Sequence, residues 1–145
     1  MLPKIWGESA WDFLHFVTLG YPINPTAEDK QRYYQYFNDL KYVLPCDKCR
    51  NNMDEHLIKI PLTDEVLSSR ESFVKWGIDL HNSVNYDTGK PVLSYDKAMK
   101  EINNKINKNQ SNRKYNNIWL YLILLIAVIV IIYLCYLLFK KNSST

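Results

Sequence analysis

Two cysteines separated by two residues carry the clearest chemical signal in this chain. Cys46 and Cys49 directly follow Pro45, at a point where a helix is expected to begin. The free N–H groups and the partial positive charge at a helix N-terminus stabilise a thiolate, which is the reactive form of cysteine. A C-x-x-C pair by itself fits a redox-active dithiol, one half of a zinc site or a structural disulfide, so these three alternatives stay open at this point.

A second polar group begins at His81, within the sequence H-N-S-V-N. His81, Asn82 and Asn85 hold positions i, i+1 and i+4, so a helix would present them on adjoining faces. A tetrahedral zinc site needs four ligands, and neither His56 nor His81 stands at a common zinc spacing from Cys49. A zinc-binding module is therefore the second interpretation, with the spacing against it.

Residues 118–139 form an uncharged and almost wholly apolar run. At about 1.5 Å per residue, a helix of this length spans a hydrocarbon core of about 30 Å. Trp119 near one end and Lys140 beyond the other are typical of interfacial anchors. We therefore expect a transmembrane helix over 118–139 with a short tail over 140–145, as in a single-pass, tail-anchored protein.

The formal net charge of +3 is unevenly distributed along the chain. Residues 1–96 contain 10 Lys or Arg and 14 Asp or Glu, whereas residues 97–117 contain six basic residues and one acidic residue. An acidic body argues against nucleic acid as a partner. The basic stretch suits a juxtamembrane segment beside anionic lipid, and the positive-inside bias places the preceding domain on the cytoplasmic side.

Before the apolar run, hydrophobic residues recur with helical spacing and no segment alternates like a strand. Prolines and capping residues divide this region into expected helices over about 8–19, 26–44, 46–57 and 69–86, and a short fifth helix from Ser94 to about 102. Residues 103–117 are polar and rich in Asn and Lys, which predicts a linker. The expected fold class is all-α: a four-helix bundle, a short fifth helix and a transmembrane helix.

The ordered set of motifs resembles the FAD-linked sulfhydryl oxidases of the ERV/ALR type. Each motif alone is weak, but together they cover most of residues 6–91 in unbroken order. The matching elements are Trp6-Gly7, Trp11-x-x-Leu14-His15, Tyr21-Pro22-x-x-Pro25, Pro45-Cys46-x-x-Cys49, Phe73-x-x-Trp76, His81-Asn82-x-Val84-Asn85 and Gly89-Lys90-Pro91. On this resemblance, residues 1–102 are expected to form the oxidase domain.

The resemblance implies a helical bundle that holds FAD noncovalently, usually as a homodimer. It also implies a reaction in which two protein thiols become a disulfide and O₂ becomes hydrogen peroxide. Cys49 would be the cysteine next to the flavin and Cys46 the one that exchanges with substrate. The implied FAD contacts are Gly7, Trp11, His15, His81, Asn82, Val84, Asn85 and Lys90.

Two departures from the family pattern affect the expected partners. The residue before the Pro-Cys pair is often aromatic in the family, and here it is Leu44. Family members often carry a structural disulfide and a separate shuttle dithiol, whereas the third cysteine of this chain, Cys135, lies in the apolar run. The partner would therefore be a protein dithiol that reaches Cys46 directly, or a thioredoxin-like shuttle protein.

The membrane-anchored, shuttle-free form is similar to thiol oxidases of large cytoplasmic DNA viruses. This similarity implies a place in host and virion membranes, with the catalytic domain facing the cytoplasm. A non-catalytic, tail-anchored scaffold that retains the same fold is a third interpretation, beside the zinc module.

Overall fold

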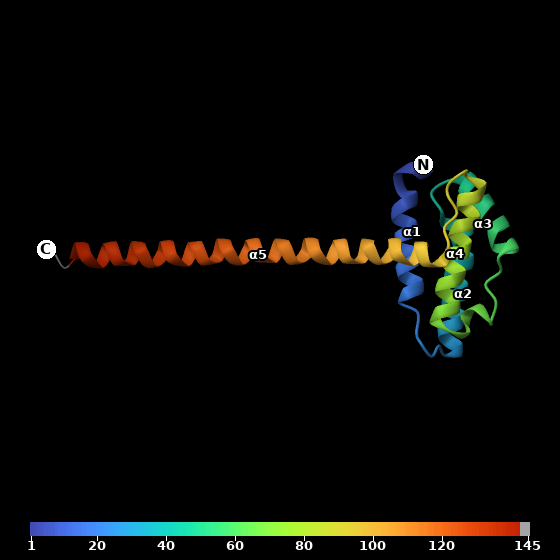
Figure 1. Cartoon of the computed structure of the whole chain (residues 1–145), viewed down its shortest axis with the longest axis horizontal. Coiled ribbons are helices and arrows are strands. Elements are labelled where there is room, and N and C mark those ends of the chain that lie inside the picture. The colour runs from blue at the N-terminus through green and yellow to red at the C-terminus, as the bar shows by residue number, and fades with distance from the viewer. Residues whose placement is uncertain (143–145) are drawn as a thin grey trace. The chain divides into compact units, whose positions relative to one another are not determined.

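The computed structural model describes the backbone of residues 1–142 and, within it, the side chains outside 109–116, 135 and 138–142. The chain divides into two units, residues 1–102 and 103–145, and each is described by itself. Over the described backbone all regular structure is helical (Figure 1), which confirms the predicted all-α fold. The elements are α1 (Pro3–Leu19), α2 (Ala27–Val43), α3 (Asp47–Lys59), the 3₁₀ turn η1 (Val66–Ser68), α4 (Arg70–Asp87) and α5 (Tyr95–Asn142).

Capping residues set the starts of two bundle helices where the sequence places them. The Thr26 hydroxyl accepts from the Asp29 N–H at 3.1 Å, and the Asp29 carboxylate accepts from the Thr26 N–H at 2.9 Å, so α2 begins with a complete capping box. The Ser69 hydroxyl accepts from the Ser72 N–H at 3.1 Å at the start of α4. Helix α1 begins at Pro3, earlier than the expected residue 8, because proline suits the first turn.

A cluster of aromatic rings fills the centre of the bundle. Phe73 is fully buried and stacks on Trp76, while Phe37 meets Trp76 edge-on at a centroid distance of 5.1 Å. The indole N–H of Trp76 donates to the Ile60 carbonyl at 3.1 Å, so its one polar atom is satisfied. Burial of each such ring contributes roughly 1.5–3 kcal/mol, which makes this cluster the main support for the helices that carry the site.

Helices α1 and α4 make a close approach at a glycine. A Cβ atom built on Gly77 would lie 3.0 Å from Cγ2 of Thr18, so the two backbones meet with no side chain between them on the α4 side. The Thr18 hydroxyl donates to the His15 carbonyl at 2.9 Å, which keeps Thr18 in place. This contact lies one helical turn from the imidazoles of His15 and His81.

Helix α5 is continuous, whereas the sequence predicted a short helix, an irregular linker over 103–117 and a separate span. The polar stretch contains no proline and no glycine, so nothing in it stops a helix that has already begun. The division of the chain into a domain, a linker and a membrane span stays a prediction. Within the second unit, Asn117–Leu134 is long and apolar enough to cross a membrane, with mean hydropathy 2.7 and none of it buried.

Candidate redox site

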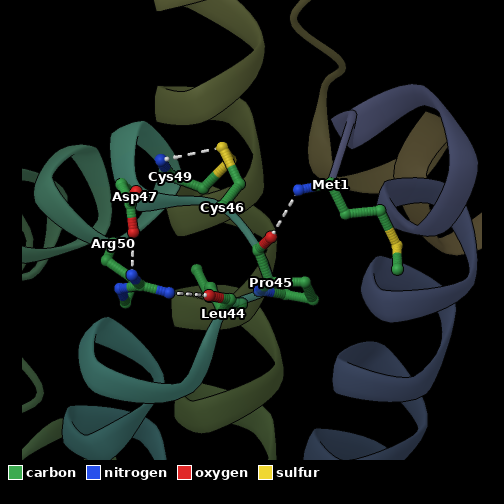
Figure 2. Close-up of polar contacts among 7 residues, drawn as sticks. All are labelled: Met1, Leu44, Pro45, Cys46, Asp47, Cys49 and Arg50. Carbon is green, nitrogen blue, oxygen red and sulfur yellow. Dashed lines mark hydrogen bonds and ion pairs between the residues drawn. A yellow bond between two sulfur atoms is a disulfide. The ribbon is translucent and has the colours of Figure 1, made fainter.

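The two cysteines lie at the start of α3 and are joined as a disulfide. Cys46 is the N-cap residue, and the Cys49 N–H donates to its sulfur at 3.3 Å (Figure 2). An N–H group directed at sulfur and the helix N-terminus both stabilise negative charge on Cys46 when the bond is reduced. Both cysteines are half-buried. Cys49 packs against the hydrophobic core, whereas Cys46 is the residue that joins the preceding loop to the first turn of α3.

The loop that leads into the dithiol is tied down by Arg50. The Leu44 carbonyl oxygen accepts from the Cys46 N–H at 2.8 Å and from the Arg50 guanidinium at 2.7 Å. The same guanidinium pairs with Asp47 (Figure 2). Leu44 is itself buried, so its side chain anchors the loop in the core. The sequence contained no signal for the role of Arg50, because its contact depends on the turn that Pro45 introduces.

A group of planar rings joins α1 to α4. Nε2 of His15 and Nδ1 of His81 form a hydrogen bond at 2.9 Å, across 66 residues of sequence. The Trp11 indole stacks on the His81 ring at a centroid distance of 4.1 Å and an interplanar angle of 8°. Three residues that the sequence assigned to one cofactor site are therefore in direct contact.

The first turns of α1 contain a polar atom without a partner. The indole N–H of Trp6 is buried and has no hydrogen-bond partner among the described residues. A buried donor left unpaired costs about 1–3 kcal/mol, so a bound group with an acceptor atom at this place would be stabilised. The next residue, Gly7, has no atom within 4 Å of the place where a Cβ would stand, so a ligand can approach its backbone.

Asn82 is used within the protein. Its side-chain amide donates to the Leu93 carbonyl at 2.8 Å and accepts from the Leu93 N–H at 3.0 Å. This pair of bonds fastens the segment after α4 to the helix itself. The neighbouring residues His81, Val84 and Asn85 are half-buried, in contrast to the buried stretch that precedes them in α4. Asn82 therefore shapes the segment that contains Lys90.

The G-K-P motif forms the end of α4. Gly89 has φ of 69°, a left-handed conformation that favours glycine. The Gly89 N–H donates to the Tyr86 carbonyl at 3.2 Å and the Lys90 N–H donates to the Asn85 carbonyl at 2.8 Å, the two bonds of a Schellman motif. Pro91 follows and prevents the helix from continuing. The motif therefore fixes where Lys90 leaves α4, with its side chain exposed.

The third histidine links α3, which begins at the dithiol, to α4. His56 on α3 is only 2% exposed, and its Nδ1 lies 2.8 Å from the hydroxyl oxygen of Ser83, inside the H-N-S-V-N motif of α4. Its Nε2 lies 3.6 Å from the Asp87 carboxylate. Among the described residues no group of three or more His, Cys, Asp or Glu is arranged to hold a metal ion. The sequence did not reveal this link between α3 and α4.

Acidification should weaken the fold through His56. Burial lowers the pKa of His56, although Asp87 opposes this effect and Lys59 and Glu55 act more weakly. Between the lowered folded-state pKa and the ordinary value of 6.5, the unfolded state binds a proton that the folded state does not. The free energy of unfolding should therefore be highest above pH 6.5. As the pH falls from 6.5 towards the lowered pKa of His56, it should decrease by at most about 1.4 kcal/mol per pH unit.

Chemical denaturation of the wild type and of a His56→Gln variant, between about pH 5 and about pH 8, measures this effect. The variant should lose part of the pH slope that the wild type shows. Equal slopes in the two proteins would mean that His56 does not resist protonation.

Comparison with known proteins places this arrangement in a family. The model of the Erv1 / Alr family matches residues 8–119, which include the dithiol and the H-N-S-V-N motif. A probable FAD-linked sulfhydryl oxidase of Acanthamoeba polyphaga mimivirus is 63% identical over 102 residues, covering 70% of this chain and 71% of the relative. The chain belongs to the Erv1 / Alr family.

Other members of the Erv1 / Alr family extend the likeness. A putative FAD-linked sulfhydryl oxidase of Invertebrate iridescent virus 6 is 35% identical over 103 residues, covering 68% of this chain and 93% of the relative. The crystal structure of the FAD binding domain of Erv1 from Saccharomyces cerevisiae superposes with a TM-score of 0.60 at 29% identity, over 65% of this chain and 87% of that one.

Proposed function

We propose that this Erv1 / Alr protein is an FAD-dependent thiol oxidase that converts pairs of protein thiols into disulfides. The observation that carries the proposal is the Cys46–Cys49 disulfide at the start of α3, in a chain whose viral relatives are named FAD-linked sulfhydryl oxidases. The helix start favours the thiolate form that thiol–disulfide exchange requires.

In the proposed reaction Cys46 exchanges with the substrate. A substrate thiolate attacks the Cys46 sulfur, a new S–S bond forms, and the bond to Cys49 breaks with Cys49 leaving as a thiolate. A second substrate thiolate attacks the substrate sulfur of this mixed disulfide and releases Cys46. The substrate has then lost two electrons, and the protein dithiol has gained them. The packing of Cys49 against the core supports its assignment as the inner cysteine.

We assign the cofactor to the surface formed by α1 and the C-terminal third of α4. When bound, FAD accepts the electron pair of the dithiol and passes it to O₂ to give hydrogen peroxide. The residues proposed to hold it are Gly7, Trp11, His15, His81, Asn82, Val84, Asn85 and Lys90. The unpaired Trp6 N–H and the stacked rings of Trp11 and His81 support this assignment, because both suit a planar ligand with acceptor atoms.

The proposed setting is a membrane surface. The apolar stretch of α5 would anchor the protein in host and virion membranes, with the bundle in the cytoplasm and the basic segment 97–117 beside anionic lipid. No cysteine other than Cys46 and Cys49 precedes Cys135, so a substrate or a thioredoxin-like shuttle protein would meet that pair directly. A homodimer is the proposed assembly.

Purification of the full chain in lipid nanodiscs tests the function. The protein should be yellow with a flavin spectrum, and it should consume O₂ and release hydrogen peroxide when given dithiothreitol. Colourless protein with stoichiometric zinc would support the zinc module instead. Bound flavin without any turnover would support a non-catalytic scaffold.

A further inference from the structure

Exposed apolar residues precede the dithiol in the chain. Tyr42 and Val43 end α2 with 68% and 69% of their surfaces exposed, and Pro45 is exposed in the connection to α3. The amino nitrogen of Met1 donates to the Pro45 carbonyl oxygen at 2.9 Å (Figure 2), so the exposed Met1 lies beside this connection, and the exposed Leu2 follows it in the chain. We call these five residues the apolar rim: Met1, Leu2, Tyr42, Val43 and Pro45.

The backbone next to the rim is already occupied by internal hydrogen bonds. The Leu44 carbonyl accepts two bonds, from Cys46 and from Arg50. The Pro45 carbonyl accepts from Met1, and proline has no N–H to donate. A polypeptide that lies across this loop therefore contacts side chains rather than free backbone groups: the apolar rim on the loop side of Cys46, and the exposed, charged Asp47 and Lys48 on the helix side. Contact through the apolar side chains tolerates many sequences.

The exchange reaction itself determines what covers the rim. In the mixed disulfide the Cα atom of the substrate cysteine must lie about 4.4–6.8 Å from that of Cys46. Tyr42, Val43 and Pro45 precede Cys46 by four, three and one residues, and each flanking substrate residue adds at most about 3.6 Å, so a few substrate residues on either side of that cysteine are long enough to span this part of the chain. A second copy of this chain is a poorer occupant, because stable binding there would cover the half-buried Cys46 and stop turnover.

We propose that the apolar rim docks an extended substrate segment in which apolar residues flank the reactive cysteine. This proposal rests on the thiol oxidase function and specifies its substrate class. Cysteine is among the most buried residue types in folded proteins, so a cysteine of an unfolded chain that will enter the core has apolar neighbours for the rim to bind. Such a rim would favour substrates that have not finished folding.

Two model peptides with the same C-x-x-C pair test the proposal. Leu and Val flank the pair in one peptide, and Ser and Gln flank it in the other. Wild-type protein in nanodiscs should oxidise the apolar peptide with a kcat/KM about tenfold higher, when each rate is divided by the dithiothreitol rate of the same preparation. In a Tyr42→Ser/Val43→Ser variant this preference should fall to about twofold or less.

Two further variants serve as controls. Ile58→Ser removes an apolar side chain of similar exposure, 73%, near the far end of α3, and it should keep the wild-type preference. Val43→Leu keeps the rim apolar and should also keep it. Flavin content and helicity are measured for every variant to verify folding.

Several results would overturn the proposal. These are equal rates for the two peptides with wild-type protein, an equal loss of preference in Ile58→Ser, or a change from dimer to monomer on light scattering of the rim variant. The last result would make the rim a contact between copies. Absence of dithiothreitol oxidation by the wild type would instead contradict the thiol oxidase function.

Discussion

Replacing Cys49 with serine should lower the rate of O₂ consumption at least about a thousandfold, because the electron pair then has no route from Cys46 to the cofactor. Bound flavin should remain, since Cys49 is half-buried at a helix start and serine is nearly the same size. An oxygen electrode with dithiothreitol as substrate measures the rate, and the flavin spectrum measures occupancy. A variant that kept full turnover would show that the assigned roles of the two cysteines are wrong.

The same variant should trap substrates. Without Cys49 the Cys46 thiolate can attack the disulfide of an oxidised partner, displace one partner thiolate and form a mixed disulfide, which no second cysteine of this bundle can attack. The matched control is Cys135→Ser, which removes the third cysteine of the chain and should leave turnover at the wild-type level. Gel electrophoresis without reductant, followed by mass spectrometry, would identify the trapped proteins and show which sequences flank their cysteines.

Replacing His81 with alanine should weaken FAD binding at least about thirtyfold, which corresponds to about 2 kcal/mol. The substitution removes the ring that stacks on Trp11 and leaves the buried His15 without its hydrogen-bond partner on α4. Purified protein should therefore lose most of its yellow colour, and titration with FAD, followed by fluorescence quenching, gives the change in Kd.

The control for this prediction is Tyr86→Ala on the same helix, where 76% of the ring is exposed. It should keep wild-type flavin content. Thermal unfolding of the flavin-free proteins separates loss of cofactor from loss of fold, because the lost His15 bond and Trp11 stacking lower the melting temperature of the apoprotein itself, whereas lost cofactor contact appears in the FAD titration. Wild-type affinity for FAD in the His81→Ala variant would contradict the assigned cofactor site.

The helices of the bundle could be predicted because local signals mark them. Thr26 and Ser69 cap α2 and α4 where the sequence indicates, and Pro45 separates α2 from α3. The 3₁₀ turn Val66–Ser68 carries no comparable signal and was expected as part of a loop. The polar stretch 103–117 was interpreted as a linker because it lacks an apolar face, but a helix that enters it meets no residue that would end it.

The site could be predicted only in part. The C-x-x-C and H-N-S-V-N motifs identify residues that could do the chemistry, and the structure brings Trp11, His15 and His81 into contact, while their contacts with FAD stay a prediction. The bond between His56 and Ser83 joins residues 27 positions apart and has no pattern in the sequence. The hydrogen bond between Asn82 and Leu93 could not be predicted either, because it depends on the path of the chain after the Schellman turn.

Gly77, where α4 approaches Thr18 of α1, has a consequence for how the family can diverge. A Cβ there would lie 3.0 Å from Thr18 Cγ2, so Thr18, whose hydroxyl donates to the His15 carbonyl, would have to shift. Natural selection on flavin binding should therefore also act on this position. Family members that keep the histidine pair should also keep glycine at position 77. Lineages that lose the histidine pair should be free to replace this glycine.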